Sequence, residues 1–373
     1  ALTEVHSMLQ RMNELAVQSA NGTNSSDDRQ AIQDEVDQLT TEIDRVAETT
    51  KFNEIYLLKG DNSNTKNVYM KGHDAGLKGT LTDGAKSATF TMDALQAGDK
   101  YTIAGKEYTI GSATTEVTAL IDKANTDATA DKANKTVDVN GKTYTITYNA
   151  AGNNTIADAD GTAITLDDLK KAVTGGSKVT YGNTSLTAMT DADTDGVDDD
   201  DSSIITKDVA ETKIKAELLT ANNIGTVDQA ATVEDANTAN GKTSYTINKG
   251  YATVADTLSF NLHVGADADM TNKITVDIDT MNSANLGIKG INVKDASGTE
   301  ATYAIDAIAD AVAKVSSQRS ALGAVQNRLE HTIDNLDNIS ENTSSAESRI
   351  RDTDMAKEMV NYSKNNILAQ AGQ

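Results

Sequence analysis

Apolar residues recur at helical spacing at both ends of the chain and alternate with polar residues through its middle. The first stripe steps by three and four residues, which predicts one amphipathic helix; it consists of Leu2, Val5, Leu9, Met12, Ala16 and Ser19. A second stripe with the same spacing consists of Ile32, Val36, Leu39, Ile43 and Val46. Between them, Asn21-Gly22 ends one helix, and the run from Ser25 to Asp28 supplies N-cap and acidic first-turn residues. We therefore expect an antiparallel pair of helices.

The C-terminal region repeats this spacing over a longer stretch. Its apolar seam consists of Ile305, Ile308, Val312, Val315, Leu322, Leu329, Leu336 and Ile339. The seam predicts a helix from about Tyr303 to Ser340, roughly 55 Å long at 1.5 Å per residue. Neither end of the chain can bury its stripe alone, so we expect both ends to pack into one bundle.

Residues 61–255 are rich in Thr, Gly, Asn, Asp and Ala and show strand-like alternation. One element recurs there, as GKEYTI at 105–110, GKTYTI at 141–146 and GKTSYTI at 241–247. Asn-Gly stands at the start of the last two copies and is a strong β-hairpin signal. The alternative is that the repeated YTI reflects strand propensity alone. Short helices are expected around 116–123 and 166–173. The middle therefore predicts one or two small α+β domains on a helical stalk.

Composition narrows the class of protein. The 373 residues contain 33 Lys and Arg against 56 Asp and Glu, a formal net charge of −23. Such a balance argues against nucleic acid or an anionic membrane surface as a partner. The chain has no Cys, which excludes disulfides and thiolate metal sites, and no Pro, which suits long uninterrupted helices. Hydrophobic residues make up 38 %, too few for one thick core, so long thin bundles and small sheet domains fit better.

Four stretches together resemble bacterial flagellin and occur in that family's order. They are LQRMNELAVQSANGTN at 9–24, EIDRVAETTKFN at 42–53, LHVGADADMTNKITVDIDTMNSANLGI at 262–288 and ESRIRDTDMAKEMVNYSKNNILAQAG at 347–372. The resemblance covers 1–58 and 258–373, whereas the middle is similar to the family's variable outer region. It implies a structural subunit of the flagellar filament, whose terminal helices pair while variable domains project outward.

The expected fold is multidomain α+β. A long antiparallel helical bundle, built from both chain ends plus a β-hairpin, would carry one or two inserted small α+β outer domains. The expected boundaries are 1–60 and 256–350 for the two halves of the helical inner domain and 61–255 for the outer part. Residues 351–373 are expected to be a stub of the innermost filament segment, poorly ordered without its partner. A helix already in register at Ala1 indicates that the chain was cut from something longer. The resemblance implies further helical segments before Ala1 and after Gln373, so we expect a fragment that lacks the innermost helices and stays monomeric.

The resemblance also implies partners and a location. These are other flagellin subunits, joined in a homopolymer through the terminal helices that this chain is expected to lack, a flagellar export chaperone and the filament cap. The subunit would be secreted without a cleaved signal and lie outside the cell in the flagellum, with neither nucleic acid nor membrane as a partner.

Toll-like receptor 5 is a further implied partner. The positions that match its recognition site are Arg11, Leu15, Gln18 and Glu35. Arg11, Leu15 and Gln18 step by four and three, so they share a helix face, and arginine is a common interface anchor. The alternative is that these residues pack subunit against subunit in the filament, and the two roles do not exclude each other.

The stretch DADTDGVDDDDS at 191–202 has the spacing of a calcium loop. Asp191, Asp193, Asp195 and Gly196 would occupy positions 1, 3, 5 and 6, and Asp199 position 9. Position 12 is Ser202 in place of the bidentate Glu, and no clear helix precedes the loop. A solvated acidic loop is the alternative. Calcium is thus the one cofactor to consider.

Other function classes are less well supported. The four histidines are scattered, no HExxH, GxSxG, GxGxxG or P-loop pattern occurs, and we expect no catalysis. A surface adhesin of flagellin ancestry, with a glycan- or calcium-binding outer domain, is one alternative to a filament subunit. A hook–filament junction protein is another, although such proteins match LQRMNELAVQSANGT less closely.

Overall fold

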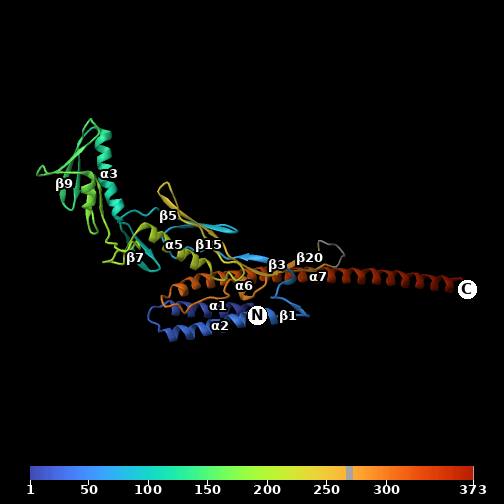
Figure 1. Ribbon diagram of the computed structural model, residues 1–373. Coiled ribbons are helices and arrows are strands. Elements are labelled where there is room, and N and C mark those ends of the chain that lie inside the picture. The colour runs from blue at the N-terminus through green and yellow to red at the C-terminus, as the bar shows by residue number, and fades with distance from the viewer. Residues whose placement is uncertain (266–271, 373) are drawn as a thin grey trace.

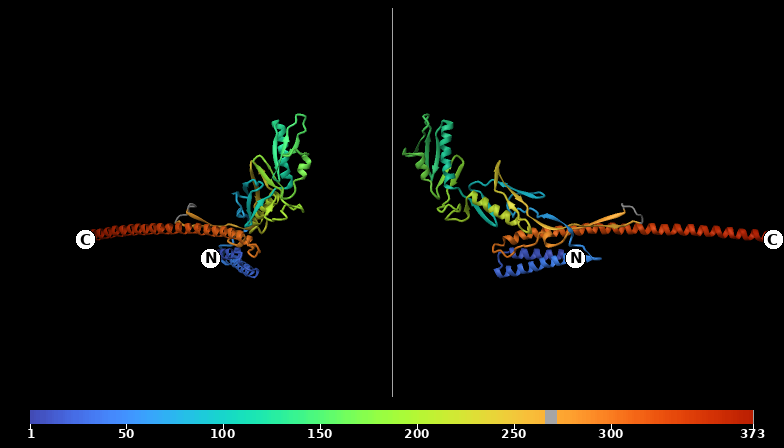
Figure 2. Two further views of the ribbon diagram at one scale, coloured as in Figure 1. Left: turned by 90° about the vertical axis from the view of Figure 1, so that its left-hand side faces the viewer. Right: turned by 45° about the vertical axis from the view of Figure 1, so that its right-hand side comes forward.

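The molecule is long and thin, with a helical stalk at one side and a strand-rich arm at the other (Figures 1 and 2). The computed structural model describes residues 1–265 and 272–372, except for the side chain of Thr353. The helices are α1 (Leu2–Ala20), α2 (Ser26–Thr49), α3 (Thr114–Asp131), α4 (Leu166–Lys171), α5 (Lys207–Asn222), α6 (Ser283–Leu286) and α7 (Thr299–Ala371).

The strands are short and fall mainly between α2 and α6. Those before α5 are β1 (Lys51–Phe52), β2 (Ile55–Tyr56), β3 (Asp61–Tyr69), β4 (Thr80–Asp83), β5 (Ser87–Asp93), β6 (Lys100–Ile103), β7 (Lys106–Ile110), β8 (Lys135–Val139), β9 (Lys142–Thr147), β10 (Thr155–Asp158), β11 (Ala163–Ile164), β12 (Lys178–Tyr181), β13 (Thr184–Thr187) and β14 (Ile204–Ile205). Those after α5 are β15 (Thr232–Val233), β16 (Asn237–Ala239), β17 (Lys242–Asn248), β18 (Tyr251–Asp256), β19 (Leu258–His263) and β20 (Lys273–Ile278).

The inner bundle consists of α1, α2, the first part of α7 and the β19–β20 hairpin. Both predicted stripes face its core, where Val5, Leu9, Met12, Ala16 and Ser19 are fully buried and Ile43 is too. The N-cap prediction is also confirmed, because Oγ of Ser25 accepts from the amide of Asp28 at 3.1 Å and the Asp28 carboxylate accepts from the Ser25 amide. These hydrogen bonds lower the pKa of Asp28.

Buried polar bonds connect α1 and α2 to the segment before α7. The side chain of Gln33 donates to the carbonyl of Ile291 at 2.9 Å and accepts from the amide of Val293 at 2.7 Å. The hydroxyl of Ser19 donates to the carbonyl of Val293. Backbone N–H and C=O groups of the non-helical segment before α7 thereby gain hydrogen-bond partners inside the bundle, as buried polar groups must.

Helix α7 departs from the predicted helix at both ends. It begins at Thr299, where the Asp295 carboxylate accepts from the Thr299 amide at 2.9 Å, and runs for 73 residues. At 1.5 Å per residue that is about 110 Å, twice the expected length. The described residues of the expected stub at 351–373 belong to this helix as far as Ala371, and their order without a partner stays a prediction. No Pro or Gly interrupts 324–371, so nothing local ends the helix there.

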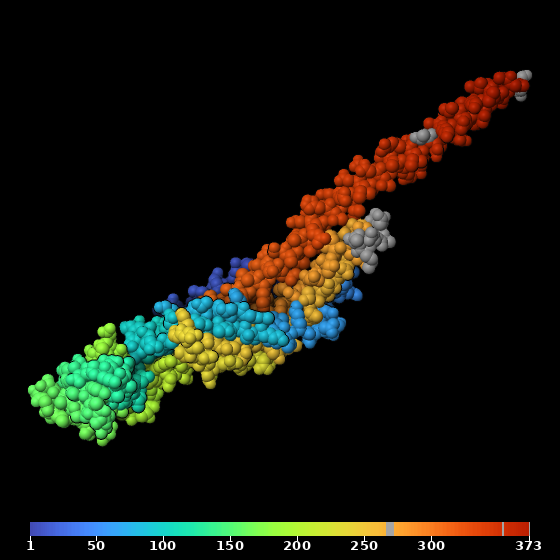
Figure 3. Space-filling model, turned by 90° about the horizontal axis from the view of Figure 1, so that it is seen from above, coloured from blue at the N-terminus to red at the C-terminus, as the bar shows by residue number. Residues whose placement is uncertain are grey.

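The predicted seam of α7 is only partly buried. Ile308 and Val315 lie in the core, but Leu322 only packs against its edge and Ile339 is 46 % exposed. The seam leaves the core beyond about Val325, where Leu329 and Leu336 are only partly buried. Figure 3 shows the C-terminal part of α7 extending free of the other elements.

Two antiparallel strands, β3 and β18, link the bundle to the outer part, and β3 begins directly after Gly60. Gly60 has φ of +79°, and a Cβ there would lie 2.6 Å from the carbonyl oxygen of Asp256. The position thus needs glycine both for its backbone angle and for the close approach of the returning strand.

The outer part has two buried clusters, which we call the near lobe and the far lobe. The near lobe packs α5 against the β15-β17-β5-β4 sheet and the β14-β7-β6 sheet, with Phe90 and Tyr245 fully buried. The far lobe packs α3 and α4 on the six-stranded sheet β11-β10-β9-β8-β12-β13. The predicted helix around 116–123 extends to Asp131, and the one around 166–173 is α4.

The YTI repeat marks three β-hairpins. The Asn140-Gly141 turn joins β8 to β9, and Asn240-Gly241 joins β16 to β17, each with both turn residues at positive φ. The third hairpin, β6–β7, uses Ala104-Gly105 at φ of +49° and +77°, although alanine is not a typical turn residue. The hairpin interpretation of the repeat is confirmed for the Asn-Gly copies and extends to the first copy.

Candidate assembly and recognition surfaces

The exposed half of α7 carries large apolar side chains that no part of the described chain covers. The most exposed are Ile350, Met355, Met359, Val360, Tyr362, Ile367 and Leu368, each at least 60 % exposed. Charged residues around them keep the helix polar as a whole, and no helix within the described residues is long and apolar enough to cross a membrane. These apolar side chains point to several sides of the helix, and Met359, Val360, Ile367 and Leu368 lie together in one shallow apolar hollow. Exposed apolar surface of this kind is typical of protein–protein contact sites. We call this surface, from Ile350 to Leu368, the α7 extension.

The predicted receptor residues lie on α1 and α2, and the structure brings two of them into contact. Nε of Arg11 donates to Oε1 of Glu35 at 2.8 Å across the two helices. Nη1 of Arg11 also lies 3.3 Å from Oε2 of Glu14. These contacts, with Glu35 the larger cause, raise the pKa of Arg11, whose side chain is half exposed. Gln18 is exposed one turn beyond Leu15.

Leu15 does not offer the accessible surface that a receptor contact needs. It is 2 % exposed and belongs to the bundle core with Leu9 and Met12. The expectation that Arg11, Leu15 and Gln18 form one open face is corrected here. The reason is that α1 packs against both α2 and α7, which buries more of its circumference than one narrow stripe.

Glu14 is a member of this surface that the sequence interpretation missed. Its spacing of three residues from Arg11 on one helix was the available signal, since such pairs are neighbours on a helix surface. The surface formed by Arg11, Glu14, Gln18 and Glu35, which we call the arginine face, presents one guanidinium held between two carboxylates.

The acidic loop folds back on itself between the two lobes. Carboxylate oxygens of Asp191, Asp193 and Asp195 lie within 4.8 Å of one another. Asp199 is not part of this group, because its Oδ2 accepts from the amide of Ala192 at 2.8 Å. The Asp191 carboxylate also accepts from the amides of Asp195 and Gly196, both at 3.1 Å. The loop can thus offer three clustered oxygens, while backbone amides already neutralise part of its charge.

Together, the terminal helices, the β-hairpin and the uncovered apolar helix describe an elongated structural subunit built to assemble. The comparisons agree. A family model described as the bacterial flagellin N-terminal helical region matches residues 1–63, and one described as the bacterial flagellin C-terminal helical region matches residues 305–373.

Full-length relatives extend the match across the middle. A flagellin of Clostridium tyrobutyricum is 34 % identical over 379 residues, covering 100 % of this chain and 76 % of that protein. A flagellin of Salmonella rubislaw is 32 % identical over 408 residues, covering 100 % of this chain and 80 % of that protein. The structure of FliC from Burkholderia pseudomallei is 17 % identical and covers 88 % of this chain and 95 % of that one, with a TM-score of 0.33, too low to bear on the fold.

The chain therefore belongs to the bacterial flagellin family. It is a structural subunit of the bacterial flagellar filament, polymerises with other flagellin subunits and is not an enzyme.

Proposed function

We propose that the α7 extension is the surface through which this subunit packs against its neighbours in the filament. The observation that carries the proposal is a set of large apolar side chains around the helix, from Ile350 to Leu368, left at 60 % exposure or more. Burying one such side chain contributes about 1.5–3 kcal/mol, so the set is large enough to drive association.

The test is filament assembly in flagellated cells that make this chain. Met359→Glu places a charge in the apolar set, and we expect few or short filaments and reduced swimming. Ser344→Glu adds the same charge at an exposed polar position on the same helix and should leave filaments intact. Normal filaments with Met359→Glu would contradict the proposal.

We further propose that the subunit is secreted to the cell exterior with the help of an export chaperone and is added to the filament under its cap. Membership of the flagellin family supports this route. The α7 extension also supports it, because an uncovered apolar helix needs a partner before assembly.

We propose that Toll-like receptor 5 binds the arginine face. A half-exposed guanidinium that is already oriented by Glu35 loses little side-chain freedom on binding, which favours Arg11 as an anchor. Leu15, being buried, would act by holding α1 in place.

A further inference from the structure

A pocket of about 260 Å³ lies where the bundle meets the near lobe. Its walls come from α7, from the Leu286–Gly287 end of α6, from Ile224 after α5, and from Met70 and His73 after β3. We call it the joint pocket, because it is lined by residues of both the bundle and the segments that lead into and out of the near lobe.

One side of the joint pocket is cationic although the chain carries a net charge of −23. Asp310 is its only acidic lining residue within the described part of the chain, and it lies 3.0 Å from Lys71 and 3.3 Å from His73. These contacts outweigh the effect of burial and keep the pKa of Asp310 below its usual value.

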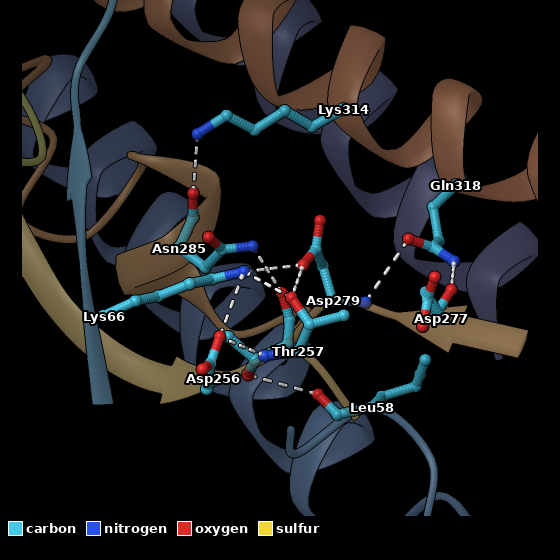
Figure 4. A network of polar contacts seen from close by, with 10 residues as sticks. Leu58, Lys66, Asp256, Thr257, Asp277, Asp279, Asn285, Lys314 and Gln318 are labelled. Carbon is cyan, nitrogen blue, oxygen red and sulfur yellow. Dashed lines mark hydrogen bonds and ion pairs between the residues drawn. The ribbon is translucent and has the colours of Figure 1, made fainter. Parts of the chain in front are cut away.

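Lys314 is the remaining cation, and among the described residues it has no carboxylate within ion-pair distance. Its ammonium donates to the carbonyl oxygen of Asn285 at 2.7 Å (Figure 4). Burial lowers the pKa of Lys314, with Asp310 and Asp279 opposing. An ammonium with one neutral acceptor at a pocket wall is short of a negatively charged partner.

The rest of the joint pocket is apolar. It is formed by Met70, Ile224, Leu286 and Ala307, of which Met70, Leu286 and Ala307 are buried. Gly287 allows the backbone to pack closely against Met70 in this wall, because a Cβ at position 287 would lie only 2.8 Å from Sδ of Met70. A volume of 260 Å³ holds roughly nine non-hydrogen atoms at about 30 Å³ each.

We propose that the joint pocket binds a small carboxylate with an unbranched apolar tail, of the size of hexanoate, with the carboxylate on Lys314 and the tail against Met70 and Leu286. The ligand would contact α6, α7 and the segments after β3 and α5 at once. Occupancy therefore stabilises the joint between the bundle and the near lobe. This site is separate from the α7 extension and from the arginine face.

The test is a saturation-transfer NMR titration with hexanoate, together with the melting temperature of the chain with and without it. We expect saturable binding and a higher melting temperature with hexanoate but neither with hexan-1-ol, which lacks the charge. Lys314→Met keeps the length of the side chain and should weaken binding at least tenfold. Arg319→Met, which removes an exposed cation from the same helix, should change it less than twofold.

A second variant separates the site from any folding defect. Ala313 is exposed and lines the pocket, so Ala313→Leu should narrow the pocket and reduce hexanoate binding while the circular dichroism spectrum stays native. No saturable binding to the native chain would overturn the proposal. Equal binding of hexanoate by the native chain and by Lys314→Met or Ala313→Leu would overturn it as well, and so would equal binding of hexan-1-ol and hexanoate by the native chain.

Discussion

Arg11 and Glu35 belong to successive helices, and their side chains meet at 2.8 Å on the bundle surface. The contact joins α1 to α2 outside the core, where a half-exposed ion pair adds little to stability. Its importance is geometric, because Glu35 holds the guanidinium fork of Arg11 in one orientation.

Removing this fork should weaken receptor binding while leaving the fold intact. For Arg11→Ala we expect the affinity for Toll-like receptor 5 to fall by about 1–3 kcal/mol, measured by surface plasmon resonance on the receptor ectodomain. Arg45→Ala is the matched control, since Arg45 is equally exposed on α2 and also pairs with a glutamate, Glu42. Equal affinities of Arg11→Ala and the native chain would remove Arg11 from the recognition site.

Gln33 should matter more to folding than any surface pair. Gln33→Ala leaves the carbonyl of Ile291 and the amide of Val293 without their buried partner, at a cost of about 1–3 kcal/mol for each. Urea unfolding followed by circular dichroism measures this loss. Gln30→Ala, one turn away and exposed, removes only a bond to Asp34 and should change stability by less than about 0.5 kcal/mol. Similar free energies of unfolding for both variants would mean that the hydrogen bonds of Gln33 to Ile291 and Val293 are not formed in solution.

The polar network around Asp279 should make the free energy of unfolding depend on pH in the acid range. Burial raises the pKa of Asp279, but hydrogen bonds from Lys66 at 2.7 Å and Thr257 at 2.6 Å outweigh it, so the net pKa is lowered (Figure 4). A carboxyl whose folded pKa is depressed stabilises the fold above its unfolded pKa of 3.8 and loses that contribution as pH falls through the folded pKa.

Lys66→Met should therefore raise the pKa of Asp279 in a carbon-detected NMR titration. The stability difference between variant and native chain should be largest at neutral pH and shrink once Asp279 is protonated in both. Lys100→Met removes an exposed lysine paired with Glu107 and should leave the Asp279 titration unchanged. An unaltered Asp279 titration in Lys66→Met would show that the ion pair does not form.

Calcium binding by the acidic loop stays a prediction, and calorimetry decides it. If Asp191, Asp193 and Asp195 hold the ion, calcium should release or absorb heat, and Asp193→Ala combined with Asp195→Ala should abolish the signal. Asp199→Ala should weaken it less, since Asp199 accepts from the Ala192 amide in the present geometry. Absence of heat at millimolar calcium would leave a solvated acidic loop.

Local patterns in the sequence were sufficient for the elements whose signals are short-range. The stripes from Val5 to Ser19 and from Ile32 to Val46 predicted two helices and their buried faces, because helical periodicity is a property of neighbouring residues. Asn140-Gly141 and Asn240-Gly241 predicted two hairpins for the same reason, since positive φ at both turn residues is a local requirement. The flagellin motifs at both ends defined the family.

The tertiary structure alone decided how far each stripe is covered. Leu15 is buried because α7 packs on the second side of α1, and Ile339 is exposed because α1 and α2 end before they reach it. Both outcomes depend on where another segment stops, which no local spacing encodes. The joint pocket likewise unites Met70, Ile224, Leu286 and Lys314 from four distant segments. Burial and charge pairing between segments hundreds of residues apart are set by packing, and only the folded chain shows them.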